Sequence, residues 1–238
     1  MSTTMNTDYP IFLGSEIDQP DPNKAMFHVL PVPFEKTVSY GGGTGKGPAA
    51  ILDASWQLEE WDGKSKPCDA GIYTCAPVDC SVSAEQVIEN IAKATADIVR
   101  HGAMPVVLGG EHTVTYGVLK GLKDAGVDDF GIVQIDAHAD LRQAYEGDLL
   151  SHASVMKRAV DMGIPLYQLG IRAFCEEEIA FREEFGVLYE VVCLDRTLPK
   201  GVSPFSSSNN VLWHALLEAI SQYSDALMLP LICCDRVI

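Results

Sequence analysis

The chain contains 238 residues, of which 47% are hydrophobic, and its formal net charge is −16 at pH 7. This length and composition suit one α/β domain with a sizeable core and exclude a disordered chain. The negative charge, without any basic stretch, argues against nucleic acid or a membrane surface as a partner and favours small cationic ligands.

The amino-terminal part of the chain combines a polar arm, a strand and a glycine-rich loop. Residues 1–25 are polar and turn-rich, contain no secretion signal and predict an arm or a subunit contact. Residues 27–32 predict the first strand. The glycine-rich residues 40–47 lead into a helix with Pro48 near its first turn, where a proline costs no hydrogen bond. Because their spacing fits neither common phosphate-binding pattern, we interpret these glycines as a tight loop that passes close to a neighbouring element.

A long helix and two strands follow. Ser83 and Gln86 form a capping box, and apolar residues at helical spacing continue to about His101. Two runs of β-forming residues, 106–110 and 131–135, flank a helical pattern. This strand–helix–strand unit predicts parallel strands, and we expect the two strands to be neighbours in the sheet.

The remaining chain continues the alternation and then changes character. We predict short strands at 71–75, 166–172 and 187–194, and helices ending near Met162 and spanning 176–185. Strands that alternate with helices predict an α/β fold of three layers, αβα, with a mainly parallel sheet. We expect a domain at 26–194 and a divergent tail at 195–238, in which 211–223 favours a helix and 229–238 is strand-like.

Cysteines and apolar runs bear on the cellular location. The seven cysteines include no Cys-x-x-Cys pair, which argues against a zinc ribbon or a redox motif and favours reduced thiols in the cytoplasm. The longest apolar run, 226–234, is far shorter than the roughly 20 residues that a membrane-spanning helix needs. We therefore expect a cytoplasmic protein without a membrane partner.

Both central strand runs end in side chains that can bind metals. His112 follows the first run, and Asp136, His138 and Asp140 follow the second at alternate positions. Alternate residues of an extended segment project to one side, and open α/β sheets bind ligands at the carboxyl ends of their strands. Mixed carboxylates and imidazoles suit Mn²⁺, and two aspartates help to offset the charge of a metal pair. Asp-x-His-x-Asp alone also fits a polar turn, but the second motif makes a metal site the stronger hypothesis.

The other histidines divide into one candidate and three structural or surface residues. His152 lies in Ser-His-Ala-Ser, where a histidine often caps a helix or faces solvent. Near a metal-activated water it would be a proton shuttle, because its ordinary pKa lies close to neutral pH. We interpret His28, His101 and His214 as structural or surface residues.

Three segments resemble the ureohydrolase family of arginases and agmatinases, and agmatinases most. They are residues 43–51, the Gly-Gly-Glu-His-Thr-Val at 109–114, and the Asp-Ala-His-Ala-Asp-Leu-Arg at 136–142 with Tyr-Glu-Gly at 145 and Ser-His-Ala at 151. The likeness spans roughly residues 27–190. It implies an arginase-like fold, a homo-oligomer, and a binuclear Mn²⁺ centre whose hydroxide attacks a guanidinium carbon to give urea and an amine. The implied substrate is a small guanidino cation, with agmatine giving putrescine.

The resemblance also assigns roles to the candidate residues. His112 and Asp140 would ligate one manganese ion, His138 the other, and Asp136 would bridge the two. His152 matches the family's position for proton transfer.

Two departures from the family pattern leave alternatives open. Glu111 stands where the family usually has aspartate, and after Asp140 the sequence contains no Asp-x-Asp pair and no matching distal glutamate. We therefore hypothesise a C-terminally incomplete ureohydrolase, with a tail after about Val192 that is no longer family sequence. One alternative is an inactive ureohydrolase-like protein that binds at most one metal. Another is a metal-dependent deacetylase, although such enzymes usually carry paired histidines that this chain lacks.

Overall fold

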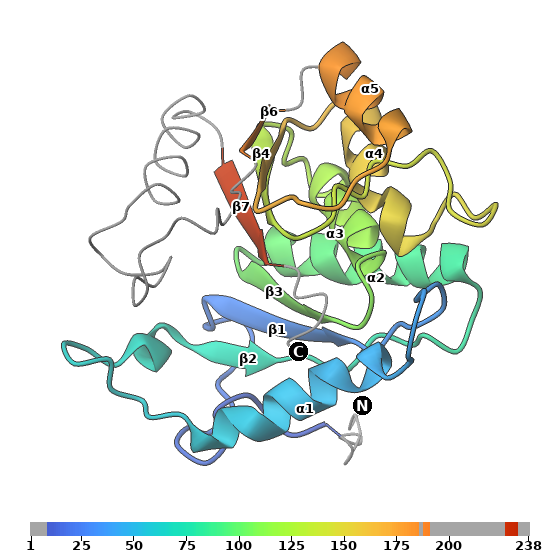
Figure 1. The fold of residues 1–238 in the computed structure, drawn as a ribbon. Helices are drawn as coiled ribbons and strands as arrows, with labels where there is room; N and C mark the ends of the chain where they lie inside the picture. Colours follow the sequence, from blue (N-terminus) through green and yellow to red (C-terminus); the bar gives the residue numbers. More distant parts are fainter. Residues whose placement is uncertain (1–8, 186–187, 191–226, 233–238) are drawn as a thin grey trace, which may run out of the picture. The chain divides into compact units, whose positions relative to one another are not determined.

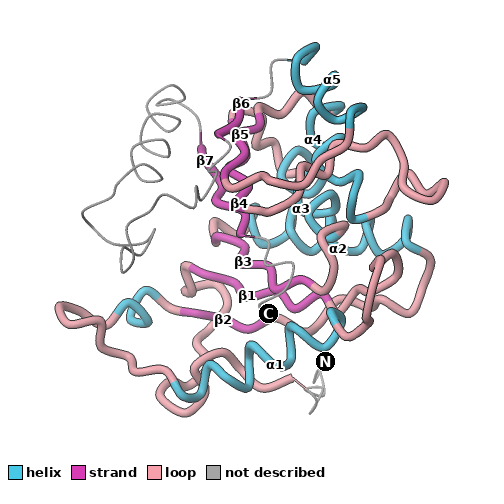
Figure 2. The backbone as a smooth tube through the Cα atoms, in the orientation of Figure 1, coloured by secondary structure: helices cyan, strands magenta, loops and turns pink. Residues whose placement is uncertain are grey.

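The computed structural model describes residues 9–185, 188–190 and 227–232. The chain forms two compact units, Met1–Val127 and Asp128–Ile238. Each unit contains a parallel sheet with helices (Figures 1 and 2). Within the described residues, no helix combines the length and the apolar character needed to cross a membrane.

The first unit is built on a three-stranded parallel sheet of order β2-β1-β3. Its strands are β1 (Phe27–Val32), β2 (Ile72–Thr74) and β3 (Met104–Gly109). β1 pairs with both others, so it is the central strand, and its residues after Phe27 are buried. The predicted first strand is confirmed with the same bounds.

Helices cover both faces of this sheet. They are α1 (Gly47–Ala54), α2 (Ala84–Arg100) and α3 (Val114–Asp124). The chain moves outward from β1 to β2 and back across β1 to β3, and right-handed crossovers therefore put α1 and α2 on opposite faces (Figure 1). Short 3-10 helices span Thr44–Lys46, Ser55–Gln57, Pro67–Ala70 and, in the second unit, His152–Ser154.

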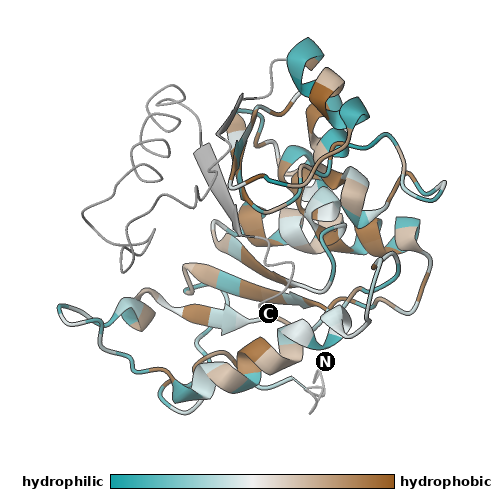
Figure 3. Ribbon diagram, in the orientation of Figure 1, coloured by the Kyte–Doolittle hydropathy of each residue, from teal (hydrophilic) through white to brown (hydrophobic). Residues whose placement is uncertain are grey.

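The capping box begins α2 as predicted. The Ser83 hydroxyl accepts the Gln86 N–H at 3.3 Å, and the helix ends at the predicted place, with His101 as its C-cap. Val87 and Ile91 are fully buried, so the apolar side of the helix contributes to the core of this unit. In Figure 3, β1 and β3 are largely in the brown of hydrophobic residues.

α2 and α3 pack closely because α3 carries two glycines, one turn apart. A Cβ atom at Gly117 would lie 2.7 Å from Ile91 Cβ. A Cβ atom at Gly121 would lie 2.4 Å from the carbonyl oxygen of Ala92. No ordinary side chain fits at either position without moving a helix.

The second unit is built on a four-stranded parallel sheet of order β6-β5-β4-β7. The strands are β4 (Phe130–Ile135), β5 (Leu166–Leu169), β6 (Leu188–Glu190) and β7 (Leu227–Ile232). β4 pairs with β5 along one edge and with β7 along the other. The prediction that β3 and β4 are direct neighbours is therefore wrong, because a strand has only two edges and both edges of β4 are occupied.

Two helices accompany this sheet, α4 (Val155–Asp161) and α5 (Glu176–Phe185). The strands β4, β5 and β6 follow one another in one direction across the sheet, so both crossover helices lie on the same face (Figure 1). α5 is largely hydrophilic (Figure 3). β7 begins two residues before the segment predicted to be strand-like, 229–238, and overlaps it up to Ile232. The helix predicted at 211–223 falls outside the described residues.

The four cysteines of the described part of the chain, Cys68, Cys75, Cys80 and Cys175, are free. Burial raises the pKa of Cys75 to about 11. Burial, with a smaller contribution from the Asp79 carboxylate, raises the pKa of Cys80 to about 11 as well.

We therefore expect Cys75 and Cys80 to be unreactive at pH 8. Each unit of pKa increase lowers the thiolate fraction tenfold, so alkylation should be about 100-fold slower than in the unfolded chain. Peptide mapping by mass spectrometry after timed iodoacetamide labelling, with and without urea, measures this ratio. Equal rates in both states would contradict the expectation.

Candidate metal centre

The first candidate motif continues directly from β3. The Gly110 N–H donates to the Val32 carbonyl at 2.9 Å, and the Glu111 N–H donates to the Phe34 carbonyl at 2.9 Å. A Cβ atom at Gly110 would lie 2.0 Å from the Phe34 carbonyl oxygen. Glycine is thus required for this close approach, which carries the chain to His112, a side chain only 3% exposed.

Glu111 binds the loop that follows β1. Its Oε2 accepts the N–H groups of Lys36 at 2.6 Å and Thr37 at 2.7 Å. Its Oε1 accepts the hydroxyls of Thr37 at 2.8 Å and Thr113 at 2.9 Å. The side chain is 2% exposed, so the carboxylate stabilises the loop from inside the protein. The sequence pattern gave no sign of this role, since Glu111 was recognisable only as a departure from the family motif.

We expect Glu111→Gln to loosen this loop. One oxygen becomes an NH₂ group, which cannot accept the N–H donors, and a buried donor left without an acceptor costs about 1–3 kcal/mol. Urea unfolding should show this loss, and hydrogen exchange should accelerate at Lys36 and Thr37. The exposed Glu59→Gln is the matched control, with a change within about 0.5 kcal/mol. Unchanged exchange at Lys36 and Thr37 would refute the role.

The glycine-rich loop, residues 40–47, binds the carboxylate of Glu35, which precedes it in the sequence. Glu35 accepts the N–H groups of Gly43 and Gly45, each at 2.7 Å. These hydrogen bonds lower the pKa of the Glu35 carboxyl group. A Cβ atom at Gly42 would lie 2.6 Å from the same carboxylate. The prediction of a tight loop close to a neighbouring segment is thus confirmed, and the loop amides that a phosphate would need already serve Glu35.

The second candidate motif follows β4 and keeps three ligand-type residues within one short loop. Asp136 is 6% exposed and Asp140 is 4% exposed. The His138 side chain is 50% exposed, and its Nδ1 lies 3.8 Å from Asp136 Oδ1. That same oxygen accepts the His138 N–H at 2.9 Å. Asp136 and Asp140 also offer carboxylate oxygens within 4.8 Å of each other. The structure therefore brings Asp136 close to both His138 and Asp140 in the second unit, whereas His112 belongs to the first.

The backbone of Asp140 has a left-handed conformation, with φ of 53°. Only glycine, asparagine and aspartate adopt it readily. The Asp140 carbonyl accepts the N–H groups of Met156 at 3.0 Å and Lys157 at 3.1 Å, in the first turn of α4. The helix start therefore holds the end of the loop in place.

His152 precedes α4. Its Nδ1 lies 3.4 Å from Ser151 Oγ, and its ring meets the Tyr145 ring edge-on with centroids 5.7 Å apart. The neighbouring Ala153 carbonyl accepts the Arg142 N–H at 3.3 Å. His152 is thus held in the segment that lies against the 140–142 backbone.

The donor set of the second motif fits a metal ion. Burying a carboxylate is unfavourable unless a cation or strong hydrogen bonds compensate it, and this loop buries two carboxylates beside an imidazole. Oxygen and imidazole ligands together match Mn²⁺ better than a thiophilic metal.

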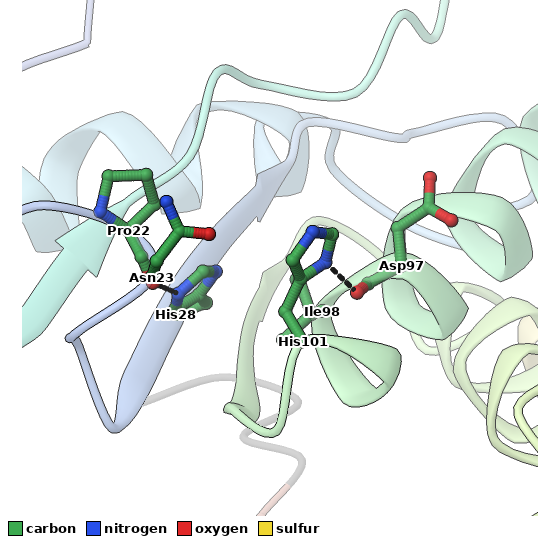
Figure 4. Close-up of a pocket in the computed structure, with 6 residues that line it drawn as sticks. All are labelled: Pro22, Asn23, His28, Asp97, Ile98 and His101. Carbon is green, nitrogen blue, oxygen red and sulfur yellow. Dashed lines mark hydrogen bonds between the residues drawn. The ribbon is translucent and has the colours of Figure 1, made fainter.

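A separate cavity lies elsewhere in the first unit (Figure 4). It measures about 260 Å³ and lies at the amino end of β1 and the end of α2. His28 Nε2 is 2.9 Å from the Pro22 carbonyl, and His101 Nδ1 is 2.6 Å from the Asp97 carbonyl. These histidines hold the backbone, and the cavity lies at the opposite end of the strands from His112. His214 falls outside the described residues.

Comparison with known proteins decides the family. The family model described as Arginase matches residues 25–197, which is most of the chain. The chain belongs to the arginase family. This membership agrees with the motifs at 109–114 and 136–142, both of which lie inside the matched region.

Individual relatives include ureohydrolases with two named activities. An N(1)-aminopropylagmatine ureohydrolase from Synechocystis is 40% identical over 158 residues, which cover 63% of this chain and 52% of that protein. An agmatinase from Pyrococcus horikoshii is 31% identical over 176 residues, which cover 72% of this chain and 60% of that protein. The chain therefore spans little more than half the length of these arginase-family relatives.

Solved structures confirm the predicted arginase-like fold. The agmatine ureohydrolase of Thermoplasma volcanium matches with a TM-score of 0.70 at 24% identity, covering 98% of this chain and 71% of that chain. At this identity the match establishes the α/β fold of the arginase family.

Proposed function

We propose that this chain acts in a manganese-dependent hydrolase that releases urea from a small cationic guanidino compound. The observation that carries the proposal is the loop after β4, where two buried aspartates and a histidine are held within five residues of an arginase-family sequence. Cytoplasmic location and homo-oligomeric assembly, both predicted from the sequence, belong to the same proposal.

We assign the metal ligands from residue type and motif. By the family motif, His112 and Asp140 would hold one manganese ion, His138 would hold the other, and Asp136 would contribute to both. When bound, the ions supply a hydroxide nucleophile near neutral pH and withdraw charge from the reacting centre.

The protein groups then orient the substrate and move protons. The overall charge of −16 favours a guanidinium cation over neutral amides. Because His152 Nδ1 lies beside Ser151 Oγ, we assign proton transfer to the leaving amine to His152 Nε2.

Agmatine is the substrate we propose first, with putrescine and urea as products. The relative named N(1)-aminopropylagmatine ureohydrolase supports a second candidate, the aminopropyl derivative of agmatine. Both carry the same guanidinium group, so one assay of urea release compares them directly.

The first measurement is the manganese content of the purified chain after loading and removal of free metal. Two ions per chain with urea release from agmatine or its aminopropyl derivative would support the proposal, and arginine and guanidinobutyrate test the selectivity. One ion or none, without urea release, would overturn it in favour of an inactive ureohydrolase-like protein. Acetate release from acetylated polyamines, without urea, would overturn it in favour of a deacetylase.

A further inference from the structure

A buried chain of polar side chains leads to Asp136. Gln134 on β4 and Gln168 on β5 are directly opposite each other in the strand register, and both are fully buried. Arg182 of α5 is 4% exposed. Parallel strands covered by helices are normally filled with valine, isoleucine and leucine, so two adjacent glutamines need an explanation.

The hydrogen bonds that link these side chains all run in one direction, with donors pointing from Arg182 toward Asp136. Arg182 Nε donates to Gln168 Oε1 at 3.1 Å, and Gln168 Nε2 donates to Gln134 Oε1 at 2.6 Å. Gln134 Nε2 then donates to Asp136 Oδ2 at 3.0 Å. A guanidinium can only donate and a carboxylate can only accept, so the two ends fix the orientation of both amides between them.

The second N–H of each amide binds the metal-motif loop itself. Gln168 Nε2 donates to the Ala139 carbonyl at 2.7 Å, and Gln134 Nε2 donates to the His138 carbonyl at 3.2 Å. Both donors of both amides are therefore used. A chain that runs from a cation to an anion strengthens each of its bonds, because every amide dipole points the same way.

A buried carboxylate holds the far end of the same loop. Glu178, 3% exposed, accepts the Leu141 N–H at 3.0 Å through Oε1. Its Oε2 accepts the Cys175 N–H at 2.7 Å. Side chains from β4, β5 and α5 thus fix the 136–141 backbone at both ends.

We propose that Gln134, Gln168 and Arg182 are positioning residues that set the Asp136 carboxylate and the 136–140 loop in the conformation that binds metal. The inference rests on the proposed function for its metal, but the loop geometry exists without the ion. The hydrogen bond from Gln134 keeps one Asp136 oxygen oriented. The loop therefore does not have to rearrange when the metal binds.

The test replaces each glutamine by methionine, which has a similar length but no hydrogen-bonding amide. In Gln134→Met and Gln168→Met, Mn²⁺ affinity measured by calorimetry should fall about 10–100-fold, the range found when partners that orient metal ligands are removed. Hydrogen exchange of the 137–141 amides in the metal-free protein should accelerate about tenfold or more. The global unfolding midpoint in urea reports whether each variant is folded.

Leu169→Met is the matched control. Leu169 is buried on the same strand as Gln168, and it accepts the Asp136 N–H at 3.0 Å through its main-chain carbonyl. Methionine keeps that carbonyl, so the replacement changes only the packing of the side chain. Manganese affinity and loop exchange should stay at the wild-type values. A control effect as large as that of Gln168→Met would overturn the positioning role.

The double variant shows whether Gln134 and Gln168 act together as one hydrogen-bonded series or as two independent contacts. If the two amides act in series on Asp136, the loss of Mn²⁺ affinity in Gln134→Met with Gln168→Met should be smaller than the product of the single losses. A loss in the double variant equal to the product of the two single losses would show that the two glutamines act independently.

Failure of this inference differs from failure of the proposed function. A wild-type protein that binds no Mn²⁺ refutes the function, while loop exchange in the metal-free protein still tests the positioning. Folded variants with wild-type loop exchange refute the positioning, whatever the metal does.

Discussion

Asp140→Asn is expected to weaken Mn²⁺ binding by at least about 100-fold, since even residues that only orient a metal ligand cost 10–100-fold when removed. The exchange removes one negative charge and one anionic oxygen from the proposed site. Asparagine tolerates the left-handed backbone seen at Asp140, with φ of 53°, so the loop keeps its conformation. Calorimetric titration with Mn²⁺ measures the affinity, and urea unfolding without metal checks that the fold is retained.

Asp129→Asn provides the control for Asp140→Asn. Asp129 is exposed just before β4 and undergoes the same chemical change in the same unit. Its manganese affinity should equal that of the wild type. Wild-type affinity in Asp140→Asn would remove Asp140 from the set of ligands.

Gly121→Ala is expected to destabilise the first unit by about 1–3 kcal/mol, the usual cost of overpacking a tight core. In an exposed helix the same change would stabilise by about 0.5–1 kcal/mol, because alanine loses less backbone entropy than glycine. Here the added methyl group would lie 2.4 Å from the Ala92 carbonyl oxygen and 2.6 Å from Thr95 Cβ, so α2 and α3 must separate. A lower urea midpoint in Gly121→Ala would therefore show that steric overlap outweighs the gain in helix propensity.

Gly47→Ala tests helix propensity without the steric conflict. Gly47 begins α1, and an added Cβ atom would lie 3.4 Å from the Gly109 carbonyl oxygen, an ordinary contact. Its stability should stay within about 1 kcal/mol of the wild type. If Gly121→Ala raised stability, the close packing of α2 and α3 would be refuted.

Local patterns predicted the elements well because their causes are local. The capping box at Ser83 begins α2 where expected, and β1 and α5 have the bounds that the sequence predicted. The two metal-type motifs follow β3 and β4, since the change from β-forming residues to glycine or polar residues marks a strand end.

Strand pairing and the buried polar network were not predictable in the same way. β4 pairs with β7, whose sequence lies far along the chain, and nothing near β4 identifies that partner. Gln134 and Gln168 were each visible as a glutamine within an apolar strand, which is the only sign the sequence offers of their network. Their hydrogen bonds depend on the register of β4 with β5 and on α5, and neither can be inferred from a single segment.

The placement of β7 has a consequence for the order of folding. Phe130 pairs with Leu227, whereas Ile132 pairs with Leu166, so the second pairing closes a loop roughly a third as long. The longer closure costs about 1 kcal/mol more in chain entropy, and we therefore expect β4 to join β5 before it joins β7. Until β7 pairs with β4, one edge of β4 can pair with β7 of another molecule. Refolding at high protein concentration thus favours exchange of β7 between molecules, and dilution favours closure within one.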